Sequence, residues 1–381
     1  MGVYLDYNAS TPIDQRVLEK MVDIYKNHYG NADSRTHKFG MTTKSIVENA
    51  RRQIGNLLGV PGEYVYFTSG STESNNIAIL GLEEYGCVSG KRHIITTAME
   101  HKSVLEPCRY LEKKGFEVEY IMPHKDGRVS AEEILHHVRP DTLLVSVMHV
   151  NNETGTIQPV DEIGKALEET EVYFHVDASQ SCGKLVEEIQ NLSYDLLSVS
   201  AHKMYGPQGV GCLVMKNKNS GKTRVKPIMY GGGQERGIRP GTLPVALICG
   251  MGEAAAILLK EYRDNGRMFK DNQDMILNVL RENKIRYHVN GDLNFSMHNT
   301  LNISFENYDS EALMLALEAE NLAGISNGSA CTSHSYAPSY VLQSMGLDDK
   351  RIACSVRVSW GKEPIEKSVI MKMAEIIKGW Q

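Results

Sequence analysis

Hydrophobic and polar positions follow two periods along the first 215 residues. Apolar residues recur at helical spacing at Val17, Met21 and Ile24, and again between residues 46 and 57. Helix-like segments at 103–114, 131–138 and 160–169 separate short β-rich runs, which lie at 65–68, 93–97, 118–121, 143–147, 173–176, 196–199 and 211–214. This alternation predicts an α/β fold with a mostly parallel seven-stranded sheet and helices on both faces. Sheets of this kind bind ligands at the carboxyl ends of their strands.

The pattern changes after residue 215. A polar, glycine-rich stretch at 216–241 leads into a long helical stretch at 243–283. Strand-like runs at 300–305 and 356–360 then alternate with helical stretches at 310–320 and 364–380. We therefore expect two domains: a large ligand-binding domain over 15–260, and a smaller α+β domain formed by 1–14 and 261–381.

Composition and charge exclude several classes of protein. The 381 residues include 41 Lys and Arg against 47 Asp and Glu, a formal charge of −6, which argues against broad charge-driven binding to nucleic acid or anionic membranes. The most apolar stretch, 245–259, is too short to span a bilayer. The seven cysteines form no CxxC pair, and we expect no metal site. The first residues lack a signal-peptide pattern, so we expect a cytoplasmic protein.

A lysine follows the apolar strand predicted at 196–199. Lys203 lies in Ser200-Ala-His-Lys-Met-Tyr-Gly-Pro-Gln-Gly-Val-Gly211, immediately before a glycine-rich turn. If its amine is buried there, the pKa falls, which suits a lysine that forms a Schiff base. The alternative is a lysine that extends from the sheet edge into solvent.

An aspartate follows the strand predicted at 173–176. Asp177 precedes Lys203 by 26 residues and is expected at the same sheet edge. A pyridoxal cofactor needs a carboxylate beside its ring nitrogen, so that the ring can accept electrons. The alternative role for Asp177 is to cap the helix that follows.

Two further strand ends carry polar groups. At Phe67–Asn75 a strand turns into a helix, where backbone N–H groups and the hydroxyls of Ser71 and Thr72 form a phosphate site, or simply cap the helix. His101 follows the strand at 93–97, where its ring either stacks on a planar cofactor or is structural. Four strand ends that converge on one edge predict a cofactor site there.

Eight segments together resemble one family. They are LDYNASTP (5–12), TSGSTESNN (68–76), EHKS (100–103), NNETG (151–155), HVDASQ (175–180), SAHKMYGPQGVG (200–211), GGGQERGIRPGT (231–242) and SNGSACTS (326–333). In this order they resemble the cysteine desulfurases of the NifS/IscS family, which are class V, fold-type I pyridoxal-phosphate transferases. The resemblance implies pyridoxal 5'-phosphate as the cofactor, L-cysteine as the substrate and a homodimer with its active site at the subunit interface. It also implies a sulfur-acceptor protein.

The resemblance assigns roles around the cofactor ring. Lys203 resembles the lysine that binds the cofactor as an aldimine, and Asp177 resembles the partner of the pyridinium nitrogen. Gln180 resembles the donor to the phenolic oxygen of the ring. His101 is similar to the histidine that stacks on the ring and assists proton transfer.

The resemblance also assigns phosphate and substrate contacts. Thr72, Ser200 and His202 match phosphate contacts, and Thr242 matches a contact supplied by the other subunit. Asn152, which is also expected near the cofactor, and Arg357 resemble the groups that hold the substrate carboxylate. A guanidinium suits that role because it binds a carboxylate through two parallel hydrogen bonds.

One cysteine distinguishes this chemistry from other pyridoxal reactions. Cys331 lies in a run of small polar residues, Ser326–Ser335, which is typical of a loop. A thiol on such a loop is either an incidental surface group or a nucleophile. The resemblance favours the nucleophile, which would take sulfur from L-cysteine as a persulfide on Cys331 and leave L-alanine.

Three alternatives remain open at the level of sequence. They are a selenocysteine lyase, an aminotransferase and a catalytically silent sulfur-carrier or assembly subunit. Ala337-Pro-Ser339 stands where the family often has Glu-Pro-Ser, and only 20 residues follow Gly361, fewer than in the iron–sulfur-assembly members. This ending resembles that of desulfurases that serve DNA phosphorothioation, and iron–sulfur cluster assembly and tRNA thiolation stay open as alternative pathways for the sulfur.

Overall fold

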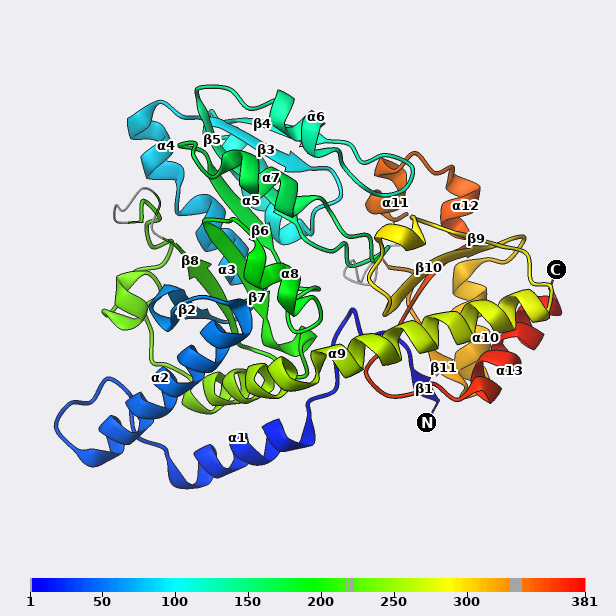
Figure 1. Cartoon of the computed structure of the whole chain (residues 1–381), viewed down its shortest axis with the longest axis horizontal. Helices are drawn as coiled ribbons and strands as arrows, with labels where there is room; N and C mark the ends of the chain where they lie inside the picture. The colour runs from blue at the N-terminus through cyan, green and yellow to red at the C-terminus, as the bar shows by residue number, and fades with distance from the viewer. Residues whose placement is uncertain (1, 217, 219–222, 329–337, 381) are drawn as a thin grey trace.

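A seven-stranded sheet forms the centre of the molecule (Figure 1). The computed structural model describes residues 2–216, 218, 223–328 and 338–380. Along the sheet the strands are β2 (Val65–Thr68), β8 (Gly211–Met215), β7 (Leu196–Ser200), β6 (Tyr173–Asp177), β5 (Thr142–Met148), β3 (His93–Thr97) and β4 (Glu117–Ile121). Strands β7 to β4 are mutually parallel, and β8 is antiparallel to both of its neighbours. The predicted mostly parallel seven-stranded sheet is confirmed.

Helices cover both faces of this sheet because its strands are apolar on both sides. Every residue of β3, β5, β6, β7 and β8 is buried, as expected for strands between two helical layers. One face packs against α3 (Ser71–Leu80), α4 (Glu83–Ser89) and α5 (Lys102–Glu112). The other face packs against α2 (Lys38–Leu58), α6 (Ala131–His136), α7 (Val160–Leu167), α8 (Val186–Asn191) and the first half of α9 (Val245–Glu282), with α1 (Gln15–Asn27) outside them.

A second hydrophobic cluster lies under a three-stranded antiparallel sheet. Its strand order is β12 (Ser355–Ser359), β10 (Thr300–Phe305) and β9 (Tyr287–Val289). Trp360 and Tyr308 are fully buried in this cluster, against α10 (Ser310–Ala319) and α13 (Lys367–Lys378). Strand β1 (Val3–Tyr4) pairs in parallel with β11 (Ala323–Gly324), and Leu5 enters the same cluster. The short helices α11 (Tyr340–Ser344) and α12 (Asp349–Ala353) lie beside it.

Helix α9 connects the two hydrophobic clusters. It is one continuous helix of 38 residues, and Figure 1 shows it running from the large sheet to the small one. Ile248 and Leu258 are buried in the first cluster, whereas Phe269 and Leu280 are buried in the second. The predicted boundary between residues 260 and 261 lies inside this helix. The division into domains of 15–260 and of 1–14 with 261–381 stays a prediction.

Short elements account for most differences from the sequence prediction. The sequence did not predict strands β1, β9 and β11 or helices α4, α8, α11 and α12, because two to seven residues carry too little periodicity. The strand predicted at 356–360 lies at Ser355–Ser359, and the last helix begins at Lys367 after Glu366 in extended conformation. The part of the chain that the structure describes also contains the short 3-10 helices η1 (Gly62–Tyr64), η2 (Ala201–Lys203), η4 (Gln234–Gly237) and η5 (Leu293–Phe295). None of the helices in the described ranges is long and apolar enough to cross a bilayer.

Candidate active site

Lys203 ends the 3-10 helix η2, directly after β7. The last residue of β7, Ser200, is buried, so the strand delivers the lysine to the edge where the carboxyl ends of the parallel strands meet. The Lys203 amine is half-buried and donates to the backbone carbonyl oxygens of Asn8 and Ala9, the second at 2.8 Å. The residues just after β1 therefore form one wall around this amine.

Asp177 ends β6, the strand beside β7, and lies at the same edge. Its Oδ2 accepts a hydrogen bond from Asn75 Nδ2 at 2.8 Å. Its Oδ1 accepts from the backbone N–H of Ser179 at 3.0 Å and from the hydroxyl of Ser179. Both oxygens act as acceptors, which is the arrangement of an ionised carboxylate. The structure thus brings Asp177 and Lys203 together, as the strand-end argument predicts.

Gln180 follows Asp177 in the same turn. It is buried, and its Nε2 donates to the carbonyl oxygen of Asn8 at 3.0 Å. Its Oε1 is buried without a hydrogen-bond partner among the described residues. A buried amide with one unsatisfied atom is the kind of group that a bound ligand completes.

The start of helix α3 faces the end of β7. Gly70 precedes the helix at φ 152°, without a side-chain cap, and a Cβ on Gly70 would lie 3.6 Å from Ser200 Oγ. The first N–H groups of a helix lack intrahelical acceptors, so this turn suits an anion. Ser71 is half-buried there, and Thr72 is exposed.

His202 lies between Ser200 and Lys203. Its Nδ1 is 3.3 Å from Ser10 Oγ. Burial, with the nearby positive charges of Lys203 and Lys184, lowers the pKa of His202 to about 4. The imidazole is therefore neutral at physiological pH, and its one N–H can donate a hydrogen bond to an anion without a positive charge on the ring.

His101 is the N-cap of helix α5. Its Nδ1 accepts from the backbone N–H of Ser103 at 3.1 Å and lies 2.8 Å from Ser103 Oγ. Burial, chiefly, lowers the pKa of His101. The ring lines a cavity of about 610 Å³ that also includes Asn152, Glu153 and Tyr340.

Arg357 and Asn152 meet on the small-sheet side of the site. Arg357 is buried in β12, and its Nη1 donates to the carbonyl oxygen of Asn152 at 3.0 Å. Its Nη2 donates to Asp6 Oδ1 at 2.5 Å. Arg357 Nε and Asn152 Oδ1 are buried without partners among the residues that the structure describes.

Two predicted site residues are not placed in this arrangement. Thr242 is exposed and makes no hydrogen bond to the described part of its own chain. Cys331 lies outside the described residues. Gly328 and Pro338, the nearest described residues on either side, both line the cavity beside His101.

Four residues of the site have no role predicted from the sequence: Asp6, Asn8, Asn75 and Ser103. Asn8 is buried, and its Nδ2 donates to Asn152 O at 3.1 Å and to Thr300 Oγ1 at 2.9 Å. The signal for Asp6 and Asn8 was available, because both are polar residues in the segment LDYNASTP, next to a short strand. Asn75 lies in TSGSTESNN and Ser103 lies in EHKS, two of the segments on which the resemblance rests, so the same kind of indication was available for them.

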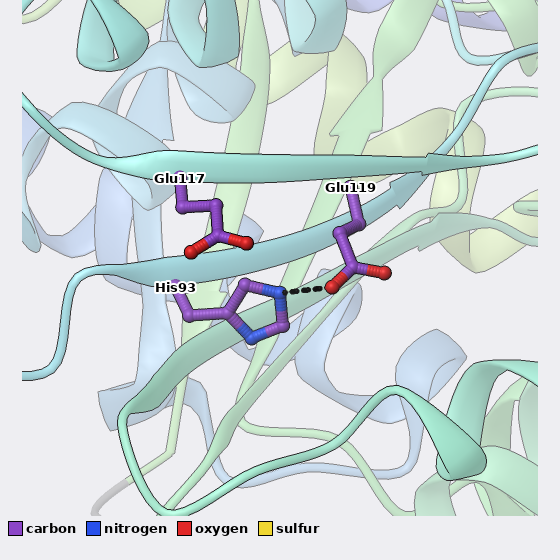
Figure 2. A group of neighbouring side chains, drawn as sticks. All are labelled: His93, Glu117 and Glu119. Atoms are coloured by element: carbon purple, nitrogen blue, oxygen red, sulfur yellow. Dashed lines mark hydrogen bonds and ion pairs between the residues drawn. The ribbon is translucent and has the colours of Figure 1, made fainter.

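A second cluster of titratable groups lies at the opposite end of the sheet's outer strands. Figure 2 shows His93, Glu117 and Glu119, the one group of metal-ligating side chains found in the described ranges. His93 Nε2 is 3.1 Å from Glu119 Oε1. Arg139 donates to both oxygens of Glu117 and also pairs with Asp141. Because Arg139 already pairs with Glu117 and Asp141, we interpret the cluster as part of an ion-pair network at the sheet edge.

Comparison with known proteins identifies the class of this fold and site. Residues 3–364 match the family model of the class-V aminotransferases. The chain is also 45% identical over 369 residues to the cysteine desulfurase IscS of Mannheimia succiniciproducens, which covers 96% of this chain and 90% of the relative. The chain therefore belongs to the class-V aminotransferases, and within them it is a cysteine desulfurase with pyridoxal 5'-phosphate as its cofactor.

Solved structures agree with this assignment. A NifS-like protein superposes with a TM-score of 0.90 at 36% identity, over 100% of both chains. DndA from Streptomyces lividans superposes with a TM-score of 0.82 at 43% identity, over 94% of this chain and 99% of that one. The fold-type I architecture and the cysteine desulfurase resemblance found in the sequence are confirmed.

Proposed function

We propose that this chain converts L-cysteine to L-alanine and retains the sulfur as a persulfide on Cys331. The observation that carries the proposal is the convergence of the Lys203 amine, the Asp177 carboxylate and the start of helix α3 at one sheet edge. This arrangement offers a nucleophilic amine, a carboxylate and an anion site to one planar, phosphorylated molecule.

The residues present fit pyridoxal 5'-phosphate. Gln180 Oε1, Asn152 Oδ1 and Arg357 Nε are buried polar atoms without partners in the described ranges, and polar groups of the cofactor and substrate would satisfy them. Lys203 would hold the cofactor, Asp177 its ring nitrogen and His101 its ring face. The phosphate would lie against the start of α3, near the side chains of Ser71, Thr72, Ser200 and His202.

Different side chains of the protein have different roles in the reaction. When bound, pyridoxal phosphate supplies an electron sink next to the α-carbon of the substrate. Lys203 Nζ accepts and later returns the α-proton, and Asp177 keeps a negative charge beside the ring nitrogen. Arg357 and Asn152 orient the substrate carboxylate, for which Arg357 Nε–H is an available donor.

The sulfur transfer step belongs to Cys331. Its thiolate forms a sulfur–sulfur bond with the substrate sulfur, and the carbon–sulfur bond breaks with its electron pair remaining on carbon. Addition of a proton to that β-carbon and return of the α-proton by Lys203 to the α-carbon give L-alanine, and the persulfide passes to an acceptor protein. The buried cysteines fit this role less well, since burial raises the pKa of Cys108 and of Cys182 to about 12.

The assembly and pathway are further parts of the proposal. The exposed position of Thr242 supports a homodimer in which Thr242 completes the phosphate site of the partner. We place the enzyme in the cytoplasm, with DNA phosphorothioation as the pathway that consumes its sulfur.

The test is product analysis of the holoenzyme with L-cysteine. We expect equimolar L-alanine and transferred sulfur, with one extra sulfur atom on the peptide that contains Cys331. A keto acid in place of L-alanine would indicate an aminotransferase, and turnover of selenocysteine alone would indicate a selenocysteine lyase. A colourless protein that holds no cofactor would indicate a silent assembly subunit.

A further inference from the structure

A chain of four side chains connects His101 to Asp177. His101 Nδ1 is 2.8 Å from Ser103 Oγ, and Ser103 Oγ is 2.8 Å from Asn75 Nδ2. The same Asn75 Nδ2 is 2.8 Å from Asp177 Oδ2. Ser103, Asn75 and Asp177 are all buried, so water does not substitute for these partners.

The direction of each hydrogen bond in this chain is fixed by chemistry. The backbone N–H of Ser103 can only donate, and it points to His101 Nδ1 at 3.1 Å. His101 Nδ1 is therefore an acceptor without a proton. The hydroxyl of Ser103, which contacts the same nitrogen, must donate its hydrogen to it, and its oxygen is left to accept from Asn75.

The orientation of the Asn75 amide is fixed as well. Its NH2 group has two hydrogens, one for Ser103 Oγ and one for Asp177 Oδ2. The opposite orientation would place Asn75 Oδ1 against the carboxylate of Asp177 and leave Ser103 Oγ without a donor. The ionised Asp177 thus aligns the amide, the amide aligns the hydroxyl, and the hydroxyl aligns the histidine.

We propose that Ser103 and Asn75 are positioning residues that keep the single ring proton of His101 on Nε2 and tie the orientation of that ring to Asp177. The inference rests on the proposed roles of His101 and Asp177 in the cofactor site. A neutral imidazole with its proton on Nε2 presents one defined donor to the cavity, which is what proton transfer to a substrate needs.

The charges around His101 favour the same state. Asp177 on β6 stabilises a protonated ring, whereas Lys203 on η2 and Lys102 on α5 oppose it. Burial, the largest contribution, favours the neutral ring and lowers the pKa of His101. Two donors on Nδ1 add to this preference, because both are lost if that nitrogen takes up a proton.

The decisive measurement is the tautomer of His101 in the holoenzyme. Selective 15N-histidine labelling, with His101 assigned through a His101→Gln sample, reports whether Nδ1 carries a proton. The wild-type enzyme should show Nδ1 without a proton throughout the neutral range. Ser103→Ala should show a mixture of tautomers, with the pKa of His101 raised by about half a unit to one unit, since one neutral hydrogen bond is lost.

Matched variants separate positioning from general structural damage. Ser103→Thr keeps the hydroxyl and should restore the wild-type tautomer. Ser146→Ala is the control. Ser146 Oγ is 2.8 Å from Nδ1 of the buried His175 in the large sheet, so this substitution also removes a hydrogen bond between a serine and a histidine. It should leave the His101 signals unchanged.

A second variant breaks the chain at its other end. Asn75→Asp has nearly the same shape but offers an acceptor to Ser103, so the hydroxyl should turn away from His101. Its His101 spectrum should then match that of Ser103→Ala. Both variants should lower kcat roughly tenfold with little change in KM, and both should shift the acid limb of the kcat profile upward.

The outcomes distinguish this inference from the proposed function. If Ser103→Ala and Asn75→Asp both keep Nδ1 free of protons and retain the wild-type pH profile, the positioning role is wrong. If the wild-type enzyme releases no sulfur from L-cysteine while the tautomer still follows Ser103, the proposed function fails and the hydrogen-bond chain stands.

Discussion

The side-chain amine of Lys203 donates a hydrogen bond to the backbone carbonyl oxygen of Asn8, which lies 195 residues earlier in the chain. The same oxygen accepts from Gln180 Nε2. The segment after β1 therefore presents backbone carbonyl groups to the amine. Its position depends on Asn8 Nδ2, which reaches across to Thr300 Oγ1 on the small sheet.

Loss of Lys203 should abolish covalent attachment of the cofactor. Borohydride reduction of the wild-type holoenzyme should link the cofactor to the peptide that contains Lys203, and Lys203→Ala should carry no reduced adduct. Lys102→Ala, a change close to His101, is the control and should keep the adduct on Lys203. An adduct on any other lysine of the wild-type enzyme contradicts the assignment.

Loss of the Cys331 thiol should stop sulfur transfer without preventing substrate binding. Cys331→Ser should bind L-cysteine, seen as a change in the visible spectrum, and should release no sulfide and carry no persulfide. Variants of the other cysteines, Cys87, Cys108, Cys182, Cys212, Cys249 and Cys354, should retain activity and change stability at most. Wild-type turnover by Cys331→Ser would remove this residue from the reaction.

The role of Thr242 in a neighbouring active site can be tested with mixed dimers. Lys203→Ala and Thr242→Ala subunits should each be nearly inactive alone. After joint unfolding and refolding, a heterodimer has one site damaged twice and one intact site, so activity should reappear at up to about half the wild-type level per heterodimer. If isolated heterodimers stay inactive, Thr242 does not act across an interface.

The loop before Thr242 should depend on a buried ion pair. Arg51 donates to both carboxylate oxygens of Glu235 at 2.8 Å, and the Glu235 side chain also accepts from Phe67 N. Glu235→Gln should lower the free energy of unfolding by about 3 kcal/mol, because it leaves a buried guanidinium without its counter-charge.

A solvent-exposed pair provides the control for that measurement. Glu106→Gln removes the partner of Arg109 on the surface of α5 and should cost less than about 1 kcal/mol. If both substitutions lower the free energy of unfolding in urea by the same amount, the buried Arg51–Glu235 pair stabilises the fold no more than the exposed pair does.

The stability of the protein should depend on pH through Lys184. This lysine is buried, donates to the carbonyl oxygens of Gln180 at 2.8 Å and Lys203 at 3.3 Å, and has no carboxylate partner among the described residues. Burial, with the charge of Lys203, lowers the pKa of Lys184 to about 7. In the unfolded chain its pKa is about 10.4, so between these values the unfolded state binds more protons.

The sign of the effect follows from that difference. Stability should rise as the pH increases from about 7 toward 10, by at most about 1.4 kcal/mol per pH unit. Below about pH 7 both states are protonated and the contribution is flat. Lys184→Met should lack this slope, which is measured as the difference between wild-type and variant unfolding free energies across that range. Parallel pH profiles would contradict the prediction.

The strands and the polar groups at their ends were predictable because their causes are local. Strands β3, β5, β6, β7 and β8 are short, fully buried runs, and Asp177 and Lys203 lie at the ends of two of them or just beyond. Parallel strands bring their carboxyl ends to one edge, so these two groups could be placed together from the sequence.

The remaining parts of the site depend on contacts between distant segments. The Asn8 carbonyl that receives Lys203 is a backbone atom, which no residue type reveals. The link from Ser103 to Asn75 spans 28 residues and forms only because α3 and α5 pack side by side on one face of the sheet. Such a contact follows from tertiary packing, and the sequence pattern of neither helix predicts it.

Helix α9 has a consequence for how the molecule loses its structure. One uninterrupted helix contributes buried side chains to both hydrophobic clusters. If one cluster unfolded alone, its half of α9 would lose its packing while the other half stayed packed in the second cluster. A fold joined by a flexible linker would show two separate heat-absorption peaks. Because both clusters share α9, this protein should unfold in a single calorimetric transition. The van't Hoff enthalpy of that transition should equal its calorimetric enthalpy per cooperative unit.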